Sequence, residues 1–243
     1  RTDVRTRLTF EALDESYPLW SPDGRTLYYL RSESDDSAIV AFEPEGREEP
    51  REIHRDRGIQ RITSISPDGR ALAFSSADTT ANVGRSFILP LDGSSAPQLI
   101  DETTAETLDP HFSPDGRWIA YASREGGSWR IHLKTYPLTS RKWQVTDREA
   151  FWYDWGPEGD RIYHQWSGNE LLVTELDLTG ATPRVGQTSI LFDDFPTPVT
   201  SLHQFQVTGD GQRFLVSDAG GGDDGRPARL VVGWPTILSA SAR

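Results

Sequence analysis

One five-residue phrase, Ser-Pro-Asp-Gly-Arg, occurs three times in this sequence and constrains its fold more than any other feature. The phrase begins at Ser21, Ser66 and Ser113, and two altered copies follow, Gly-Pro-Glu-Gly at 156–159 and Thr-Gly-Asp-Gly at 208–211. The acidic positions of the five copies are 23, 68, 115, 158 and 210, so the steps are 45, 47, 43 and 52 residues. A repeat of this length is typical of a four-stranded propeller blade.

Each copy of the phrase has the chemistry of a tight turn. Proline presets φ at the first corner, an Asp side chain caps the turn, and glycine adopts the positive φ that closes it. We therefore predict that the repeated acidic residues hold turns rather than bind a ligand directly. They are Asp23, Asp68, Asp115, Glu158 and Asp210.

The segments around the turns predict an all-β chain with almost no helix. A short apolar run precedes each turn, a β-rich run follows it, and a third strand comes after a polar loop. We expect one propeller domain over 1–243, with blades at about 15–56, 57–102, 105–147, 150–193 and 200–236. The fifth copy lacks a fourth strand, and a spare strand at 5–10 is expected to close it; alternatively, that strand ends an upstream blade.

The flanks of the turns carry a family resemblance across essentially the whole chain. The segments Tyr17–Gly24 and Asp109–Gly116 resemble the WD-like repeat of TolB-type propellers. The later runs Lys142–Thr146, Asn169–Leu178 and Leu230–Trp234 look like the C-terminal propellers fused to bacterial serine/threonine kinases and winged-helix regulators. The resemblance implies a non-catalytic, extracytoplasmic or periplasmic module that binds a protein or senses a ligand for a signalling protein. A TolB-like docking protein of the cell envelope is the alternative.

Composition disfavours several classes of function. The formal net charge is −12, from 37 acidic and 25 basic residues, so a phosphate backbone or an anionic membrane surface would be repelled. The chain has no cysteine, which excludes disulfides and thiolate chemistry, and it contains no apolar run long enough to cross a membrane. The His-Arg-Asp at 54–56 lacks the other parts of a kinase catalytic loop. We expect a monomer that binds no metal and no cofactor.

Candidate binding residues stand at the start of each blade's first strand, because those strands line the channel of a propeller and their entry loops form one rim. Aromatic side chains and arginine are enriched at recognition surfaces. The candidates for a protein, peptide or small polar ligand are Tyr17, Arg61, Asp109, Trp152 and His203, with His111 and Asp154 one step deeper. An ordinary hydrated funnel is the competing interpretation. A glycan-acting enzyme that uses Asp109, Asp154 and Glu15 is a further alternative, because such enzymes need two nearby carboxylates.

Overall fold

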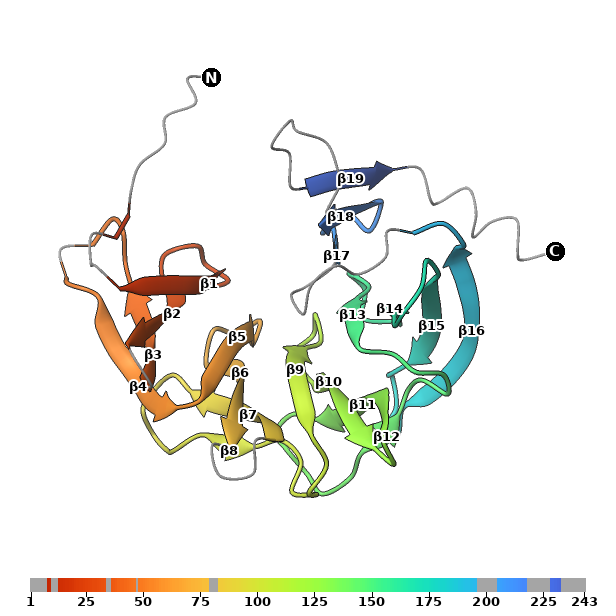
Figure 1. Cartoon of the computed structure of the whole chain (residues 1–243), viewed down its shortest axis with the longest axis horizontal. Helices are drawn as coiled ribbons and strands as arrows, with labels where there is room; N and C mark the ends of the chain where they lie inside the picture. Colours follow the sequence, from red (N-terminus) through yellow and green to blue (C-terminus); the bar gives the residue numbers. More distant parts are fainter. Residues whose placement is uncertain are drawn as a thin grey trace. The chain divides into compact units, whose positions relative to one another are not determined.

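The computed structural model describes residues 8–9, 13–33, 36–46, 48–78, 83–195, 205–217 and 228–232 (Figure 1). Every regular element within these residues is a β-strand, so none of them forms a helix that could span a membrane. The strands form repeated antiparallel sheets, which confirms the predicted fold class. The chain divides into two compact units, Arg1–Phe112 and Ser113–Arg243.

The first unit contains the first two blades and the first strand of the third repeat. One sheet has the order β1 (Asp14–Trp20), β2 (Leu27–Glu33), β3 (Asp36–Phe42) and β4 (Arg51–Arg57), and the next has β5 (Ile59–Ile65), β6 (Ala71–Asp78), β7 (Val83–Pro90) and β8 (Gln98–Leu99). The strand β9 (Thr107–Phe112) packs near β5, β6 and β7. Leu30, Ile39, Leu72 and Phe74 are fully or almost fully buried in the core that joins the two sheets.

The second unit continues the repeat. It holds β10 (Trp118–Glu125), β11 (Ser128–Thr135) and β12 (Trp143–Gln144), then a four-stranded sheet of β13 (Trp152–Trp155), β14 (Arg161–Gln165), β15 (Leu171–Asp177) and β16 (Arg184–Phe192). The fifth repeat has three described strands, β17 (Phe205–Val207), β18 (Arg213–Ser217) and β19 (Ala228–Val232). The expected closing strand at 5–10 lies outside the described residues except for Leu8 and Thr9, which belong to no strand.

The repeated phrase forms the same turn between the first two strands of the blade. In the first copy, the Asp23 carboxylate accepts hydrogen bonds from the Ser21 hydroxyl at 2.6 Å and from the Arg25 N–H at 3.1 Å. The Ser21 hydroxyl oxygen in turn accepts the N–H of Thr26 at 2.9 Å, and Gly24 has a φ of +71°. The Ser21 and Asp23 side chains therefore cap backbone N–H groups that the tight turn leaves unpaired.

Three further turns repeat this geometry. Asp68 and Asp115 accept the hydroxyls of Ser66 and Ser113, each at 2.6 Å. In the fifth repeat Thr208 takes the place of the serine: its hydroxyl donates to Asp210, and its oxygen accepts the N–H of Arg213 at 3.2 Å. The hydroxyl and the carboxylate therefore recur as a pair in these four turns, and a proline before the acid is dispensable.

The fourth turn is built differently. Gly159 has a φ of +70° and donates its N–H to the Gly156 carbonyl at 2.9 Å, as in the other copies. Gly156 has no hydroxyl to donate, however, and the exposed Glu158 side chain makes no hydrogen bond within the described chain. The backbone alone closes this turn.

Candidate functional site

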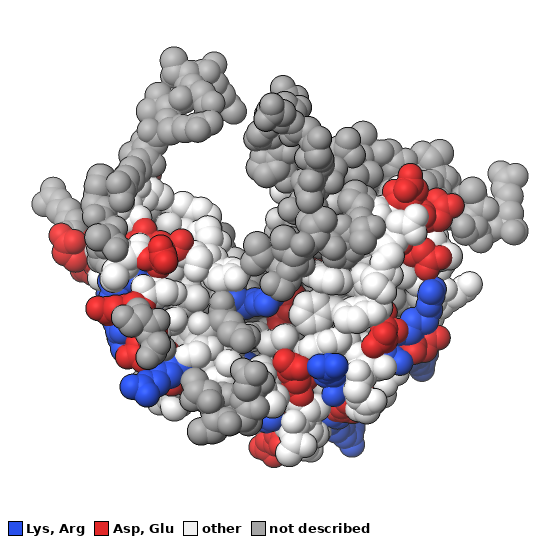
Figure 2. Space-filling model, in the orientation of Figure 1, with Lys and Arg blue, Asp and Glu red and all other residues white. Residues whose placement is uncertain are grey.

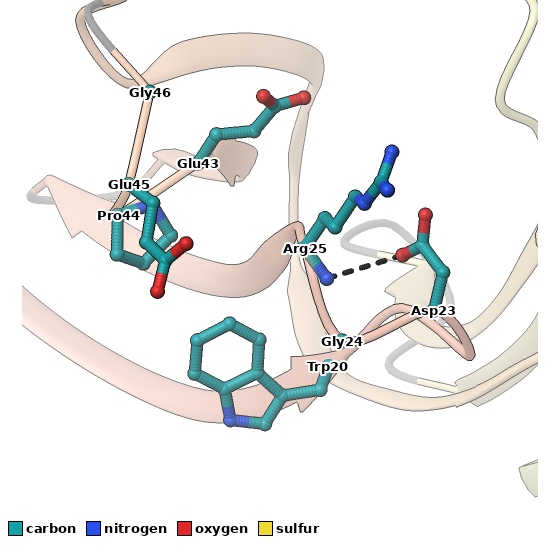
Figure 3. Close-up of a pocket in the computed structure, with 8 residues that line it drawn as sticks. All are labelled: Trp20, Asp23, Gly24, Arg25, Glu43, Pro44, Glu45 and Gly46. Carbon is teal, nitrogen blue, oxygen red and sulfur yellow. Dashed lines mark hydrogen bonds between the residues drawn. The ribbon is translucent and has the colours of Figure 1, made fainter.

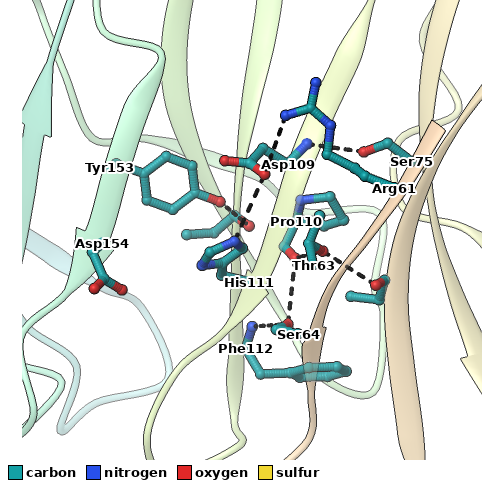
Figure 4. Close-up of polar contacts among 12 residues, drawn as sticks. Arg61, Thr63, Ser64, Ser75, Asp109, Pro110, His111, Phe112, Tyr153 and Asp154 are labelled. Atoms are coloured by element: carbon teal, nitrogen blue, oxygen red, sulfur yellow. Dashed lines mark hydrogen bonds and ion pairs between the residues drawn. The ribbon is translucent and has the colours of Figure 1, made fainter. Parts of the chain in front are cut away.

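Three of the predicted residues come together in the first unit (Figure 4). The Asp109 Oδ1 atom lies 3.9 Å from Nη1 of Arg61 and 3.8 Å from Nε2 of His111. Asp109 and His111 share one face of β9 because side chains alternate along a strand, and Arg61 reaches them from β5. Only 2% of the Asp109 side chain and 12% of the Arg61 side chain are exposed. We call these three residues the charged cluster.

Backbone strain is concentrated at the same place. Asp109 has a φ of +59° and Tyr17 a φ of +53°, and these are the described residues other than glycine with a positive φ. Both lie six positions before the acidic residue of their turn. Residues other than glycine rarely adopt a positive φ, and this conformation persists only where the surroundings impose it.

Neighbouring strands hold the strained part of β9 in place. The Ser75 hydroxyl oxygen of β6 accepts the Asp109 N–H at 3.0 Å. The Ser64 hydroxyl of β5 accepts the Phe112 N–H at 3.0 Å and donates to the Pro110 carbonyl at 3.3 Å. Three backbone groups of a four-residue stretch are therefore bound by side chains of the preceding blade.

The charged cluster has the composition of a recognition site. A buried carboxylate is costly unless opposite charges or donors face it, and here a guanidinium and an imidazole do. Tyr17 belongs to the same unit but packs against the apolar core of the first two sheets.

Asp154 has a structural role. Its Oδ1 accepts the N–H of Trp155 at 2.9 Å, and its Oδ2 accepts the N–H of Val207 in the next blade at 2.8 Å. Both carboxylate oxygens therefore hold the backbone. This arrangement disfavours a catalytic carboxylate at Asp154, and with it the glycan-acting alternative.

Trp152 packs against an aromatic residue that we did not predict. Its ring stacks on Trp166 with centroids 6.0 Å apart and an interplanar angle of 29°. Trp166 directly follows β14, whose last residue Gln165 pairs with Trp152. The sequence signal that could have indicated this contact is an aromatic residue one place after the second strand. That position lies at the same end of the blade as the start of the first strand. The remaining candidate, His203, lies outside the described residues.

Described residues of the first unit line two sizeable clefts. One, of about 470 Å³, lies between the first turn and the loop 43–46 (Figure 3). The indole of Trp20, which is 51% exposed, lines it together with Pro44 and Glu45. The other, of about 520 Å³, is lined by His54 of β4 and the loop 90–97 of the second blade.

Basic residues of the described surface are interspersed with acidic ones, as Figure 2 shows for one face. Examples are Arg55 with Glu52 at 2.6 Å, and Arg161 with Asp160 at 2.7 Å. This distribution is unlike the continuous basic stripe of a nucleic-acid site. Within the described residues, no group of three or more acidic or histidine side chains is placed to hold a metal ion.

Residues 13–217 match the family model of the TolB beta propeller domain, PD40. The chain belongs to this family. The match covers all five turn phrases, and it agrees with the resemblance drawn from them. The wider context of a fused kinase or winged-helix regulator is not part of that match.

Solved structures share the fold at low sequence identity. TolB from Acinetobacter baumannii is 20% identical with a TM-score of 0.66, over 91% of this chain and 55% of that chain. A putative TolB from Agrobacterium tumefaciens is 20% identical with a TM-score of 0.53, over 76% of this chain and 83% of that one. A chain of a nidogen/laminin complex is 14% identical with a TM-score of 0.58, over 85% and 73%. This chain thus spans about half the length of the A. baumannii protein.

Proposed function

We propose that this chain is a non-catalytic recognition module that binds a protein partner through the charged cluster of Arg61, Asp109 and His111. The observation that carries the proposal is the buried Asp109 in a strained backbone conformation, facing two groups of opposite charge or hydrogen-bonding potential. Strain of this kind is concentrated at ligand-binding sites, because binding a ligand requires a geometry that the fold alone does not favour.

Family membership supports a binding role over an enzymatic one. One solved neighbour comes from a nidogen/laminin complex and two are TolB proteins, one of them putative. We propose that this chain works outside the cytoplasm as a monomer, and serves as the recognition module of a larger bacterial signalling protein. A TolB-like docking role in the envelope is the second candidate, and the family match favours it.

Affinity capture with matched variants tests the site. The immobilised chain is incubated with an extract of its source cells, and the captured proteins are quantified by mass spectrometry. Asp109→Asn and Arg61→Ala each remove one charge of the cluster, and we expect them to reduce capture of a stoichiometric partner at least tenfold, because truncating a buried charged pair typically costs about 2 kcal/mol or more.

Asp23→Asn is the control, because it makes the same charge change in an exposed turn. Circular dichroism establishes that every variant is folded. Equal capture by the wild-type chain and all three variants would remove the charged cluster from the binding site. Recovery of the partner with an envelope fraction, rather than with a cytoplasmic one, would favour the docking role.

A further inference from the structure

The cleft of about 470 Å³ in the first blade contains an accessible indole. Trp20, the last residue of β1, is 51% exposed, which is the largest value among the exposed large hydrophobic residues of the described chain. It stands three residues before the acidic residue of its turn. In the third and fourth repeats the equivalent residues are Phe112 and Trp155, which are buried at 7% and 6% exposed. The first blade alone of these three leaves the aromatic ring open to a ligand.

The loop 43–46 places two carboxylates at the same cleft (Figure 3). The Gly46 N–H donates to the Glu43 carbonyl at 2.9 Å, so the loop is a tight turn with Pro44 at its first corner. Glu43 and Glu45 stand on either side of the proline, and both are exposed. The hydrogen bond and the proline ring fix the backbone from which these two side chains extend, so little backbone order has to be gained on binding.

The charge of this cleft is negative. Arg25 is the one basic residue among its described lining residues. The pKa of Asp23 is lowered first by the Ser21 hydroxyl and the Arg25 N–H, and further by the positive charge of Arg25, so the charges of Asp23 and Arg25 offset each other. Glu43 and Glu45 have no such counterpart, because neither side chain forms an ion pair or hydrogen bond within the described part of the chain.

Charge and shape together define the occupant. An apolar surface laid over the cleft would remove water from Glu43 and Glu45 without supplying an opposite charge, which is costly. A cation would instead pair with these carboxylates and interact with the negative face of the indole. A guanidinium is planar, so it can stack on the ring while its N–H groups point at carboxylates beside the ring. The net charge of −12 also attracts a basic partner over a longer range.

We propose that this cleft binds an arginine side chain from a basic segment of a protein partner, with the guanidinium stacked on Trp20 and paired with Glu43 or Glu45. The inference goes beyond the proposed function, because it names a second site that shares no residue with the charged cluster. Asp23 is not one of the proposed contacts, because its carboxylate is bound to the Ser21 hydroxyl and the Arg25 N–H of its own turn.

The test uses the whole chain and a blocked hexapeptide of alternating arginine and glycine as the probe. Each of the eight tryptophans gives one indole signal in a ¹H–¹⁵N spectrum, and Trp20→Phe identifies the Trp20 signal by removing it. We expect the peptide to shift this signal in a saturable manner and to bind more weakly as salt is added. A peptide with citrulline for arginine keeps the shape without the charge, and it is expected to shift nothing. A lysine peptide keeps the charge without the plane and should bind more weakly.

Matched variants locate the contact, with affinity measured by the fluorescence anisotropy of a labelled peptide. Trp20→Ala should weaken binding about fivefold, because it removes the ring that faces the cation. Glu45→Gln should weaken binding about threefold, because it removes one exposed ion pair. Glu102→Gln is the control: it makes the same change at an exposed residue outside the cleft and should leave the affinity unchanged. Circular dichroism establishes that each variant is folded, and Trp20→Phe, which keeps a ring, should retain most of the affinity.

The inference would be overturned if the Trp20 signal showed no saturable shift, if the citrulline peptide bound equally well, or if Glu45→Gln and Glu102→Gln had equal effects. A shift caused by tetramethylammonium with the arginine peptide inert would assign the cleft to quaternary ammonium groups instead. The proposed function fails separately. If Arg61-dependent capture persists while the peptide does not bind, only the cleft is wrong. If the peptide binds while Arg61→Ala captures the partner normally, the charged cluster is wrong.

Discussion

Replacing Asp154 should destabilise the second unit more than replacing Ser64, at the equivalent position of another first strand, destabilises the first unit. Its two carboxylate oxygens accept the backbone N–H groups of Trp155 at 2.9 Å and Val207 at 2.8 Å. Hydrogen bonds to a charged group contribute about 1.5 to 3 kcal/mol each, and their loss leaves partly buried N–H groups unpaired. We therefore expect Asp154→Ala to lower the free energy of unfolding by about 3 kcal/mol or more.

Ser64 provides a matched comparison in the first unit. It stands four residues before Asp68, as Asp154 stands four before Glu158, and it accepts the N–H of Phe112 from the strand β9. The Ser64 hydroxyl that accepts this hydrogen bond is neutral, so Ser64→Ala should lower the free energy of unfolding by only about 1 kcal/mol. Asp154→Asn should fall between the two, because its amide keeps one acceptor oxygen and turns an N–H donor toward the other site.

Urea unfolding followed by tryptophan fluorescence measures these free energies, and hydrogen exchange measures the Val207 amide directly. In the wild-type chain this amide should exchange slowly. Asp154→Ala should accelerate its exchange at least tenfold, and it should accelerate the exchange of neighbouring amides less. The reasoning would be refuted if Asp154→Ala were no more destabilising than Ser64→Ala, or if protection of the Val207 amide did not change.

Two further predictions concern the turns. Gly24→Ala and Gly211→Ala both place a side chain at positive φ, and each should lower the free energy of unfolding by about 1 kcal/mol. Gly211→Ala should cost more, because its Cβ would lie 3.2 Å from Pro157, whereas the Cβ at position 24 would meet nothing within 4 Å. Urea unfolding of the two variants checks this order. The Ser66 hydroxyl and the Arg70 N–H lower the pKa of Asp68 below its usual value of 3.8. The charged carboxylate therefore stabilises the folded state above about pH 4. This stabilisation is lost as the pH falls through the lower pKa of the folded state. Thermal melting from pH 6 to pH 2.5 should therefore show a smaller acid-induced decrease in Asp68→Asn than in the wild-type chain, and equal slopes would contradict the assignment.

The blade pattern was predictable because it depends on local chemistry. A turn of the type at Ser66 needs a hydroxyl, an acid and a glycine at fixed offsets, and all three can be read from consecutive residues. The fourth copy shows the limit of this reading. There the glycine at 159 keeps the turn, whereas Glu158 is exposed and does not cap it, since Gly156 supplies no hydroxyl.

Contacts between blades were harder to predict because they join residues some fifty positions apart. The sequence placed Asp154 and Trp152 at the same end of a blade, but it did not distinguish a carboxylate that holds the Val207 backbone from one that faces a ligand. Trp166 was not among the predicted site residues because those were taken from the first strand of each blade. Side chains at both ends of a β-hairpin have to be considered together before a surface can be assigned.

Comparison of equivalent positions explains why the charged cluster rather than the turns carries the proposed function. The turn residues are identical in three of the five copies, and the closing glycine is kept in all five, because each copy must form a tight bend. Six residues before the acid, the copies instead hold Tyr17, Ile62, Asp109, Trp152 and Gln204. Two of these adopt a positive φ, and one is a charged residue that is 1% exposed. Folding alone would favour glycine in that conformation and an apolar side chain in that environment. A position that departs from both preferences within a regular repeat is better explained by binding than by stability.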